Sequence, residues 1–276
     1  MTVALDSYYT IGKVHWYCQD YVCQGWQPFP HVILADGCSA SPNSDVGARL
    51  LVLNARQELA RYAQIPRDGP ELATQHWDLG RRIIQRAARQ ARELNLNPEV
   101  LDATLLVAWC DGATVYVHLY GDGCIATRRA DGELTVIEVE YAENAPYYLS
   151  YLLEPDRQVL YQEAVGNPES AQTIHYRGQA ADVSSRQERF DTPVAFSFDL
   201  ATFPTVAVAT DGLHSFISAE TGQRVELLEV AQAMFDFGDL QGTFVMDRLQ
   251  NTLIEFGNRL LFNLDDLSVG AFVKVA

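Results

Sequence analysis

Hydrophobic and polar residues alternate along this chain with two different periods, and each period predicts one kind of element. Short apolar runs indicate β-strands, whereas apolar residues that recur every three or four positions indicate amphipathic helices. In the first third of the chain, strands come before helices, and Ser44 offers an N-cap for the first helix. Strands are expected at residues 8–14, 21–26 and 31–35, followed by helices starting near residue 45 and covering 71–94.

The middle of the chain predicts a run of hairpins. Asp111-Gly112 and Asp131-Gly132 separate apolar runs, and Asp-Gly between such runs is a hairpin signal. After these hairpins, residues 141–191 lose the pattern, so we expect an irregular insertion with one short strand that shapes a substrate cleft. The remaining expected strands are 103–110, 114–120, 124–129, 134–140, 194–198, 205–209 and 267–275, and the remaining helices are 224–235 and 243–261.

This order of elements indicates an α+β protein. Hairpin-linked strands form antiparallel sheets, and two separate helix pairs can cover the outer faces of two such sheets. The sequence therefore predicts a four-layer α-β-β-α sandwich. No internal repeat or linker divides the chain, so we expect one domain over residues 1–276.

The net charge of the chain limits which partners it can bind, and its cysteine content limits which structural sites it can contain. The chain has 20 basic and 36 acidic residues and a formal net charge of −16, which disfavours binding to nucleic acid or to an anionic membrane surface. Its five cysteines form no C-x-x-C pair, which argues against a disulfide framework or structural zinc. No signal peptide and no membrane-spanning apolar run are visible. We expect a cytoplasmic monomer with reduced thiols.

Three apolar runs that lie far apart in sequence end in aspartate. They lead to Asp36, Asp211 and the pair Asp265-Asp266. An isolated Asp-Gly after a strand is often only a turn, and we interpret Asp111 and Asp131 in that way. Carboxylates that converge from several strands repel one another unless a hard cation such as Mg²⁺ or Mn²⁺ lies between them. A metal-centred hydrolytic site is therefore the leading hypothesis.

Six segments, taken in order, carry a resemblance to a known family. Their order and spacing resemble the metal-dependent serine/threonine protein phosphatases of the 2C type, especially the compact bacterial forms. The resemblance covers almost the whole chain and implies the same α-β-β-α sandwich. The segments are residues 12–20 (GKVHWYCQD), 36–37 (DG), 103–107 (ATLLV), 121–123 (GDG), 209–213 (ATDGL) and 265–269 (DDLSV).

The resemblance implies roles for individual residues. Asp36 would bridge two divalent ions, with the Gly37 carbonyl as a further ligand. Asp211 and Asp265 would complete the shell of the second ion, and Asp122 would join Asp211 at a third ion. The implied cofactors are two Mg²⁺ or Mn²⁺ ions, with a third where Asp122 also binds.

Two further residues of the first segment take part. Asp20 would hold a metal-bound water, and Gln19 would make an outer contact beside it. The implied reaction removes phosphate from phosphoserine or phosphothreonine of a phosphoprotein substrate. Two metal ions lower the pKa of a water between them and neutralise charge on the phosphoryl oxygens, so no protein nucleophile is required.

Departures from the family pattern keep alternatives open. His15 stands where the family has a phosphate-binding arginine, and imidazole is a weaker, single-point donor. His15 is therefore either a substitute phosphate contact or a residue without a phosphate role. Cys38 replaces part of a glycine-rich turn, and Gly123 replaces a serine. Two other functions stay open: a catalytically idle phosphatase fold that binds a phosphoprotein or a metal, and a phosphatase of small metabolites.

His214 follows the Asp211 turn closely in sequence. It is either a general acid or, more simply, a surface or packing residue.

Overall fold

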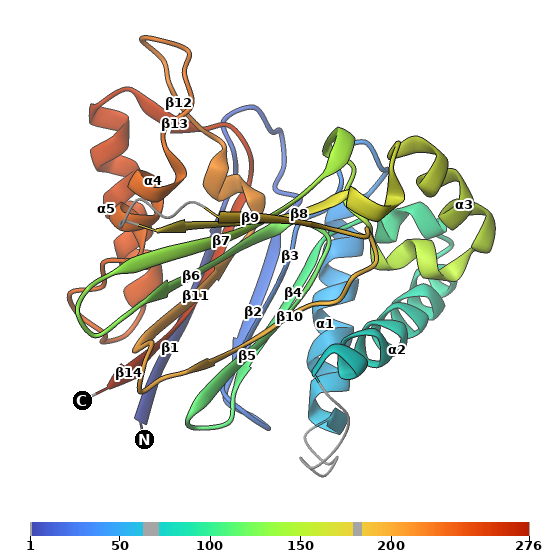
Figure 1. Cartoon of the computed structure of the whole chain (residues 1–276), viewed down its shortest axis with the longest axis horizontal. Helices are drawn as coiled ribbons and strands as arrows, with labels where there is room; N and C mark the ends of the chain where they lie inside the picture. The colour runs from blue at the N-terminus through green and yellow to red at the C-terminus, as the bar shows by residue number, and fades with distance from the viewer. Residues whose placement is uncertain (1, 63–71, 179–183, 276) are drawn as a thin grey trace.

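The larger sheet carries most of the strands. The structure, a computed structural model, describes residues 2–62, 72–178 and 184–275 (Figure 1). Within these ranges a seven-stranded sheet forms in which every neighbouring pair is antiparallel. In spatial order it consists of β1 (Thr2–Thr10), β14 (Leu267–Val275), β11 (Thr205–Ala209), β6 (Gly123–Arg128), β7 (Leu134–Tyr141), β8 (Gln172–Gly178) and β9 (Ser184–Glu188).

A second antiparallel sheet packs against the first. Among the described residues it has five strands, and a separate two-stranded ribbon pairs β12 (Phe216–Ser218) with β13 (Leu261–Asn263). The five strands, in spatial order, are β10 (Val194–Asp199), β5 (Thr114–Tyr120), β4 (Leu105–Cys110), β3 (His31–Ala35) and β2 (Tyr21–Gly25).

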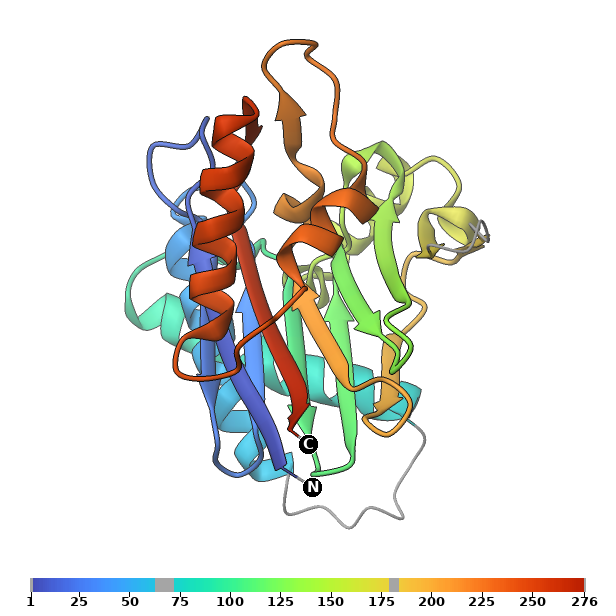
Figure 2. The same cartoon turned by 90° about the vertical axis from the view of Figure 1, so that its left-hand side faces the viewer.

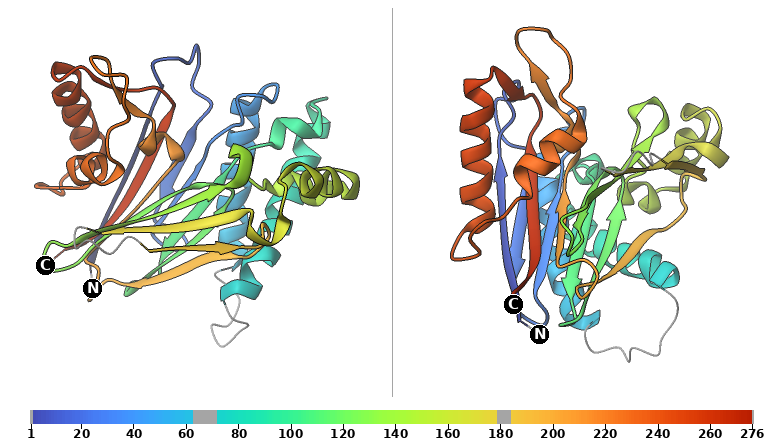
Figure 3. Two further views of the ribbon diagram at one scale, coloured as in Figure 1. Left: turned by 45° about the horizontal axis from the view of Figure 1, so that its top comes forward. Right: turned by 60° about the vertical axis from the view of Figure 1, so that its left-hand side comes forward.

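Helix pairs cover the outer faces of both sheets, which completes the expected four layers (Figures 1 and 3). α1 (Ser44–Tyr62) and α2 (Leu72–Glu93) lie on the smaller sheet, and α4 (Leu227–Met234) and α5 (Phe244–Asn258) lie on the larger one. No helix in the described part of the chain is both long and apolar enough to span a membrane. The expected start of the second helix at residue 71 lies outside the described residues.

Two sequence expectations were wrong. The first strand is β1, Thr2–Thr10, and not residues 8–14, because its full length pairs with β14 and residues 11–20 then leave the sheet. The segment 141–191 is not irregular: its described part contains the helix α3 (Pro155–Ala164) and the two strands β8 and β9. The 3-10 turn η3 (Leu149–Leu153) precedes α3 and packs beside α2 (Figure 3).

The strand β3 shows why apolar runs mark the centre of the molecule. Its five residues are all buried. Val32 and Leu34 face the core between the sheets, whereas Ile33 and Ala35 face the core under α1 and α2. Because both faces of β3 are covered, the strand is a continuous apolar run and not an alternating one.

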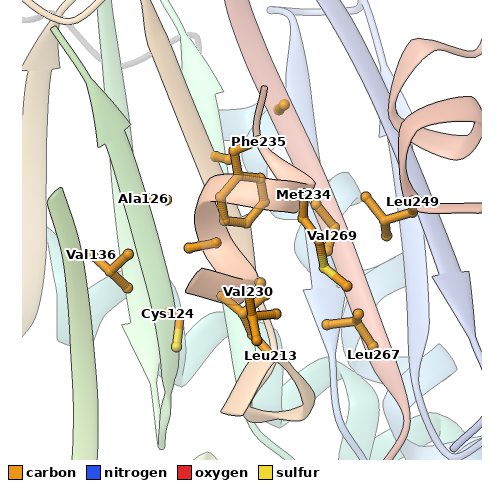
Figure 4. Packing of buried hydrophobic residues seen from close by; sticks show 14 of the residues in the cluster. Cys124, Ala126, Val136, Leu213, Val230, Met234, Phe235, Leu249, Leu267 and Val269 are labelled. Atoms are coloured by element: carbon orange, nitrogen blue, oxygen red, sulfur yellow. The ribbon is translucent and has the colours of Figure 1, made fainter. Parts of the chain in front are cut away.

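A third core lies between the larger sheet and its helices. Val269 and Leu267 of β14 pack there with Val230 and Met234 of α4 and Leu249 of α5 (Figure 4). Burying one such side chain contributes about 1.5–3 kcal/mol relative to leaving it exposed. This packing fixes α4 against the strand ends from which the candidate site is built.

The two sheets lie close together at Gly270 of β14. A methyl group added there would lie 2.2 Å from Cγ1 and 2.9 Å from Cγ2 of Val32 on β3. Val32 is fully buried, and its β-branched side chain is stiff. Glycine is therefore required at this position by the spacing of the sheets.

Four aromatic and imidazole rings form a buried stack between α2 and the smaller sheet. His118 stacks on Trp109 with ring centres 5.2 Å apart, and His76 stacks on Tyr120 at 4.2 Å. The Nδ1 atoms of His76 and His118 are 3.2 Å apart, so one ring donates to the other. Burial lowers the pKa of His118 to about 3. Burial and the charge of a protonated His118 lower the pKa of His76.

We predict that Gly270→Ala destabilises the protein by about 1–3 kcal/mol, because the added methyl overpacks the contact with Val32. The free energy of unfolding from urea titration measures the change. Gly178→Ala is the matched control, since a methyl at that strand position would come no closer than 3.8 Å to Thr135. Equal stability of the two variants would contradict the close approach of the sheets.

We predict that the two buried histidines, His76 and His118, lower the stability of the fold as the pH drops below about 6.5, whereas the aspartates with raised pKa act in the opposite direction. The unfolded histidines take up protons there, while His76 and His118 with lowered pKa stay neutral in the fold. Each contributes a loss of about 1.4 kcal/mol per pH unit. Compared with the wild type, His118→Phe should therefore gain stability between pH 7 and pH 5, because it lacks one such loss; His31, also buried with a lowered pKa, and the aspartates are kept in both proteins. Parallel pH profiles would count against this assignment.

Candidate functional site

The site begins where β3 ends, at Asp36. Its N–H donates to the Thr104 hydroxyl at 3.3 Å, and its carbonyl accepts from the Thr104 N–H at 2.8 Å. The next residue, Gly37, pairs with Ala103 and donates its N–H to the Gln19 carbonyl at 3.3 Å. These bonds fix Asp36 beside the segment that contains Gln19 and Asp20.

A carboxylate from the other end of the chain anchors that segment. Asp266 is fully buried, and its two oxygens accept from the N–H groups of Gly12 at 2.8 Å and Gln19 at 2.6 Å. Gly12 has no room for a side chain, since a Cβ would lie 2.3 Å from the Asp265 carbonyl carbon. Gln19 also donates its side-chain amide to the Ser44 hydroxyl at 2.6 Å. The loop 11–20 is therefore held at both ends against the start of β14.

His15 points from this loop toward the same carboxylates. Its Nδ1 lies 3.1 Å from Asp266 Oδ2, and its Nε2 lies 3.4 Å from Asp265 Oδ1. Burial acts to lower the pKa of His15, but the hydrogen bond and the charge of Asp266 outweigh it, so the pKa is raised. His15 thus lies in a loop, bonded to carboxylates at the edge of the site.

Asp20 is almost completely buried, with 1% of its surface exposed. Its Oδ2 accepts from the Thr210 hydroxyl at 2.9 Å, and the Thr210 oxygen in turn accepts from the Ser268 N–H at 3.0 Å. Among the described residues, Asp20 Oδ1 has no hydrogen-bond partner. Burial raises the pKa of Asp20 to about 8, and the nearby charge of Asp266 adds to the effect.

The other predicted aspartates come from three different turns. Asp211 starts the short 3-10 turn η5 (Asp211–His214) directly after β11, and Asp265 lies between β13 and β14. Asp122 lies in the turn between β5 and β6. Asp122, Asp211 and Asp265 all line one cavity of about 390 Å³.

Mutual repulsion shows that these carboxylates form one group. Burial raises the pKa of Asp36, and the charges of Asp20 and Asp211 raise it further. In the same way, burial and then Asp211 raise the pKa of both Asp122 and Asp265. The charges of these aspartates therefore act on one another, with Gly37, Gln19 and His15 nearby, although among the described residues no three of the five offer ligand atoms that all lie within 4.8 Å of one another.

This group suits a divalent cation. Within the described ranges, His15 is the only basic side chain that forms an ion pair with any of the five aspartates. The oxygens Asp20 Oδ1 and Asp211 Oδ1 are buried and have no partner among the described residues. Unpaired buried carboxylates are costly, and hard cations prefer carboxylate oxygens as ligands. The donor set thus fits Mg²⁺ or Mn²⁺.

A second, tighter set of ligand atoms lies in the wall of the same cavity. In the described part of the chain, only Glu138, Glu140 and His214 offer three ligand atoms that all lie within 4.8 Å of one another. His214 is neither a free surface residue nor apolar packing, because its Nδ1 lies 2.6 Å from Glu138 Oε1.

Sequence reasoning assigned no role to several of these residues. The doublet Asp265-Asp266 was noticed at a strand start, but Asp266 had no separate role although it anchors the loop. Thr210 was missed because a threonine before Asp-Gly looks like ordinary strand sequence. Glu138 and Glu140 gave a weak signal, two acidic residues two positions apart in an otherwise apolar strand.

Comparison with solved structures shows a shared fold. A bacterial serine phosphatase matches with 11% sequence identity and a TM-score of 0.58, over 98% of this chain and 99% of that one. The serine/threonine phosphatase Stp1 from Staphylococcus aureus matches with 12% identity and a TM-score of 0.59, over 100% and 96%. The serine/threonine phosphatase PstP/Ppp of Mycobacterium tuberculosis matches with 17% identity and a TM-score of 0.56, over 100% of both chains.

Comparison by sequence gives the family. No curated protein matches the chain. The family model described as protein phosphatase 2C, however, matches residues 13–253, which include the loop of His15 and Asp20, the Asp36 and Asp122 turns, and η5. With this match over most of its length and the shared fold, the chain belongs to the protein phosphatase 2C family.

Proposed function

We propose that this protein is a metal-dependent phosphatase that removes phosphate from phosphoserine or phosphothreonine of a phosphoprotein. The observation that carries the proposal is the group of buried and half-buried, mutually repelling aspartates, in which Asp20 Oδ1 and Asp211 Oδ1 have no partner among the described residues. Membership of the protein phosphatase 2C family supports the same chemistry.

The proposed ligands follow from their positions. The charges of Asp20 and Asp211 both raise the pKa of Asp36, so Asp36 is the proposed bridge between two ions, with the Gly37 carbonyl as a further ligand. Asp211 and Asp265 are the proposed ligands of the second ion, and Asp122 with Asp211 would hold a third. Two bound divalent ions supply a water of lowered pKa and neutralise the charge of the phosphoryl group.

The chain's own residues complete the site. Asp20, with one oxygen held by Thr210 and the other unpartnered, is positioned to accept a hydrogen bond from water. Gln19 fixes the loop through Asp266 and Ser44. Asp265 and Asp266 hold His15 in place, and we propose that its imidazole presents an N–H to the substrate phosphate at the rim.

A second candidate function has an observation in its favour. His15 contacts two carboxylates. A single imidazole also binds phosphate more weakly than the bidentate guanidinium of the arginine found in the family. This feature favours an idle phosphatase fold that binds a phosphoprotein or metal without turnover. Turnover measurements separate the two functions.

We predict that the wild-type protein hydrolyses an aryl phosphate with Mn²⁺ or Mg²⁺, and that chelator abolishes the activity. The changes Asp36→Asn and Asp211→Asn should each lower kcat by at least about 100-fold, because loss of an outer partner alone costs 10–100-fold. Asp131→Asn is the control, since Asp131 lies in an exposed turn and accepts from the Glu133 N–H.

The same assay decides between the functions. Metal binding without turnover by the wild type would refute the hydrolase and favour the idle fold, and His15→Arg would then test whether the missing guanidinium is the cause. Where turnover is found, faster hydrolysis of sugar phosphates than of phosphopeptides would contradict the protein substrate.

We predict that Asp266→Ala loosens the loop 11–20 and lowers both stability and activity. It leaves the N–H groups of Gly12 and Gln19 without their acceptor, at a cost of about 1–3 kcal/mol for each buried group. Asp266→Asn keeps the shape and one acceptor oxygen and should recover part of the loss. Urea unfolding and kcat for the aryl phosphate measure the two effects; unchanged values for Asp266→Ala would show that the anchor has no role.

A further inference from the structure

Two glutamates and a histidine converge beside the aspartate group. Glu138 and Glu140 are two positions apart in β7, so their side chains leave the same face of the sheet. His214 reaches them from the end of η5, three residues after Asp211. One ligand atom from each of the three residues lies within 4.8 Å of the other two.

Each of the two carboxylates in this trio forms an ion pair with a basic side chain of β8. Arg177 donates to Glu138 Oε2 from Nε at 2.8 Å and from Nη2 at 2.6 Å. His175 Nε2 lies 2.9 Å from Glu140 Oε2. These contacts fix Oε2 of each carboxylate, while Oε1 of Glu138 faces His214 Nδ1 at 2.6 Å. Carboxylates that ligate metals commonly have such an outer hydrogen bond, which orients them.

The trio also faces open space. Glu138, Glu140 and His214 line the cavity of about 390 Å³ that Asp122 and Asp211 share. Glu138 is nearly fully buried, whereas His214 and Glu140 are partly exposed, so a hydrated ion can reach them from the cavity. The cavity leaves room for water as a fourth ligand.

We propose that Glu138, Glu140 and His214 form a separate site for one divalent transition-metal ion, Zn²⁺ by the chemistry of its donors. An imidazole nitrogen with two carboxylate oxygens and an open fourth position is a set that Zn²⁺ accepts, whereas Mg²⁺ and Ca²⁺ take oxygen ligands. The Nδ1 of His214, which now lies 2.6 Å from Glu138 Oε1, gives its lone pair to the ion, and the ring proton resides on Nε2.

A metal ion at this site would affect the aspartate group, because the turn η5 connects His214 to Asp211. His214 and Asp211 are the last and first residues of this four-residue turn. A Zn²⁺ ion bound to His214 would hold η5 in one conformation. It would also add positive charge near Asp211, beside the ions proposed for the aspartate group. The proposal itself rests only on the geometry of the trio, and it holds or fails whether or not the protein hydrolyses phosphate.

The test is Zn²⁺ binding to the full chain by calorimetry, in excess Mg²⁺ so that the aspartate group is occupied by a hard cation. We expect the wild type to bind one Zn²⁺ per chain, and His214→Gln and Glu140→Gln each to weaken that binding at least about tenfold. Co²⁺ in place of Zn²⁺ should give a visible absorption band that His214→Gln removes. Both changed side chains are partly exposed, so the variants should fold, and urea unfolding checks this.

The control is Glu133→Gln, which removes a partly exposed carboxylate at the start of the same hairpin and should leave Zn²⁺ binding unchanged. Zn²⁺ bound equally by the wild type and by both test variants would place the ion on the aspartates and overturn the proposal. Absence of Zn²⁺ binding by the wild type would also overturn it, without any bearing on the phosphatase assay.

Discussion

The fold at this end of the molecule must oppose the electrostatic repulsion between several aspartates that lie close together and are partly removed from water. Charges a few ångströms apart interact far more strongly in a buried site than in water, and each carboxylate here makes its neighbours harder to ionise. No single element could hold such a group in place. The aspartates are instead distributed over turns that follow or precede strands of both sheets, so the cores between the layers oppose the repulsion.

The same cores explain which parts of the fold could be predicted from sequence. β3, β4 and β11 are buried throughout and almost entirely apolar because both of their faces are covered, and such runs are visible without any structure. The strand β9 is largely exposed and polar, so no hydrophobic pattern marks it. The helix α3 packs through few apolar residues, of which only Tyr161 is buried, and its turns were therefore interpreted as irregular sequence. The limits of β1 depend on pairing with β14, which no local pattern reveals.

At the candidate site, the residues that could be predicted were those that stand in a recognisable turn. Asp36, Asp122 and Asp211 each precede a glycine after an apolar run, which made them visible. Asp266 and Thr210 act through contacts with residues 190 or more positions away, and long-range partners of this kind are not encoded in local spacing. The buried glutamate of β7 was hidden for another reason. Its charge is balanced by Arg177 and His214, which lie far along the chain.

The pairing of β1 with β14 has a consequence for the order in which the protein can form. Thr2 lies opposite Val275 and Thr10 opposite Leu267, and the ends of the two strands lie side by side (Figure 2). The Gly12 N–H finds its acceptor 254 residues later, in Asp266. On the ribosome, therefore, β1 is made before its partner β14 and stays without it until residues 267–275 emerge. The larger sheet and the loop that presents Asp20 are completed only after the synthesis of this segment, which leaves β1 exposed to wrong partners during translation.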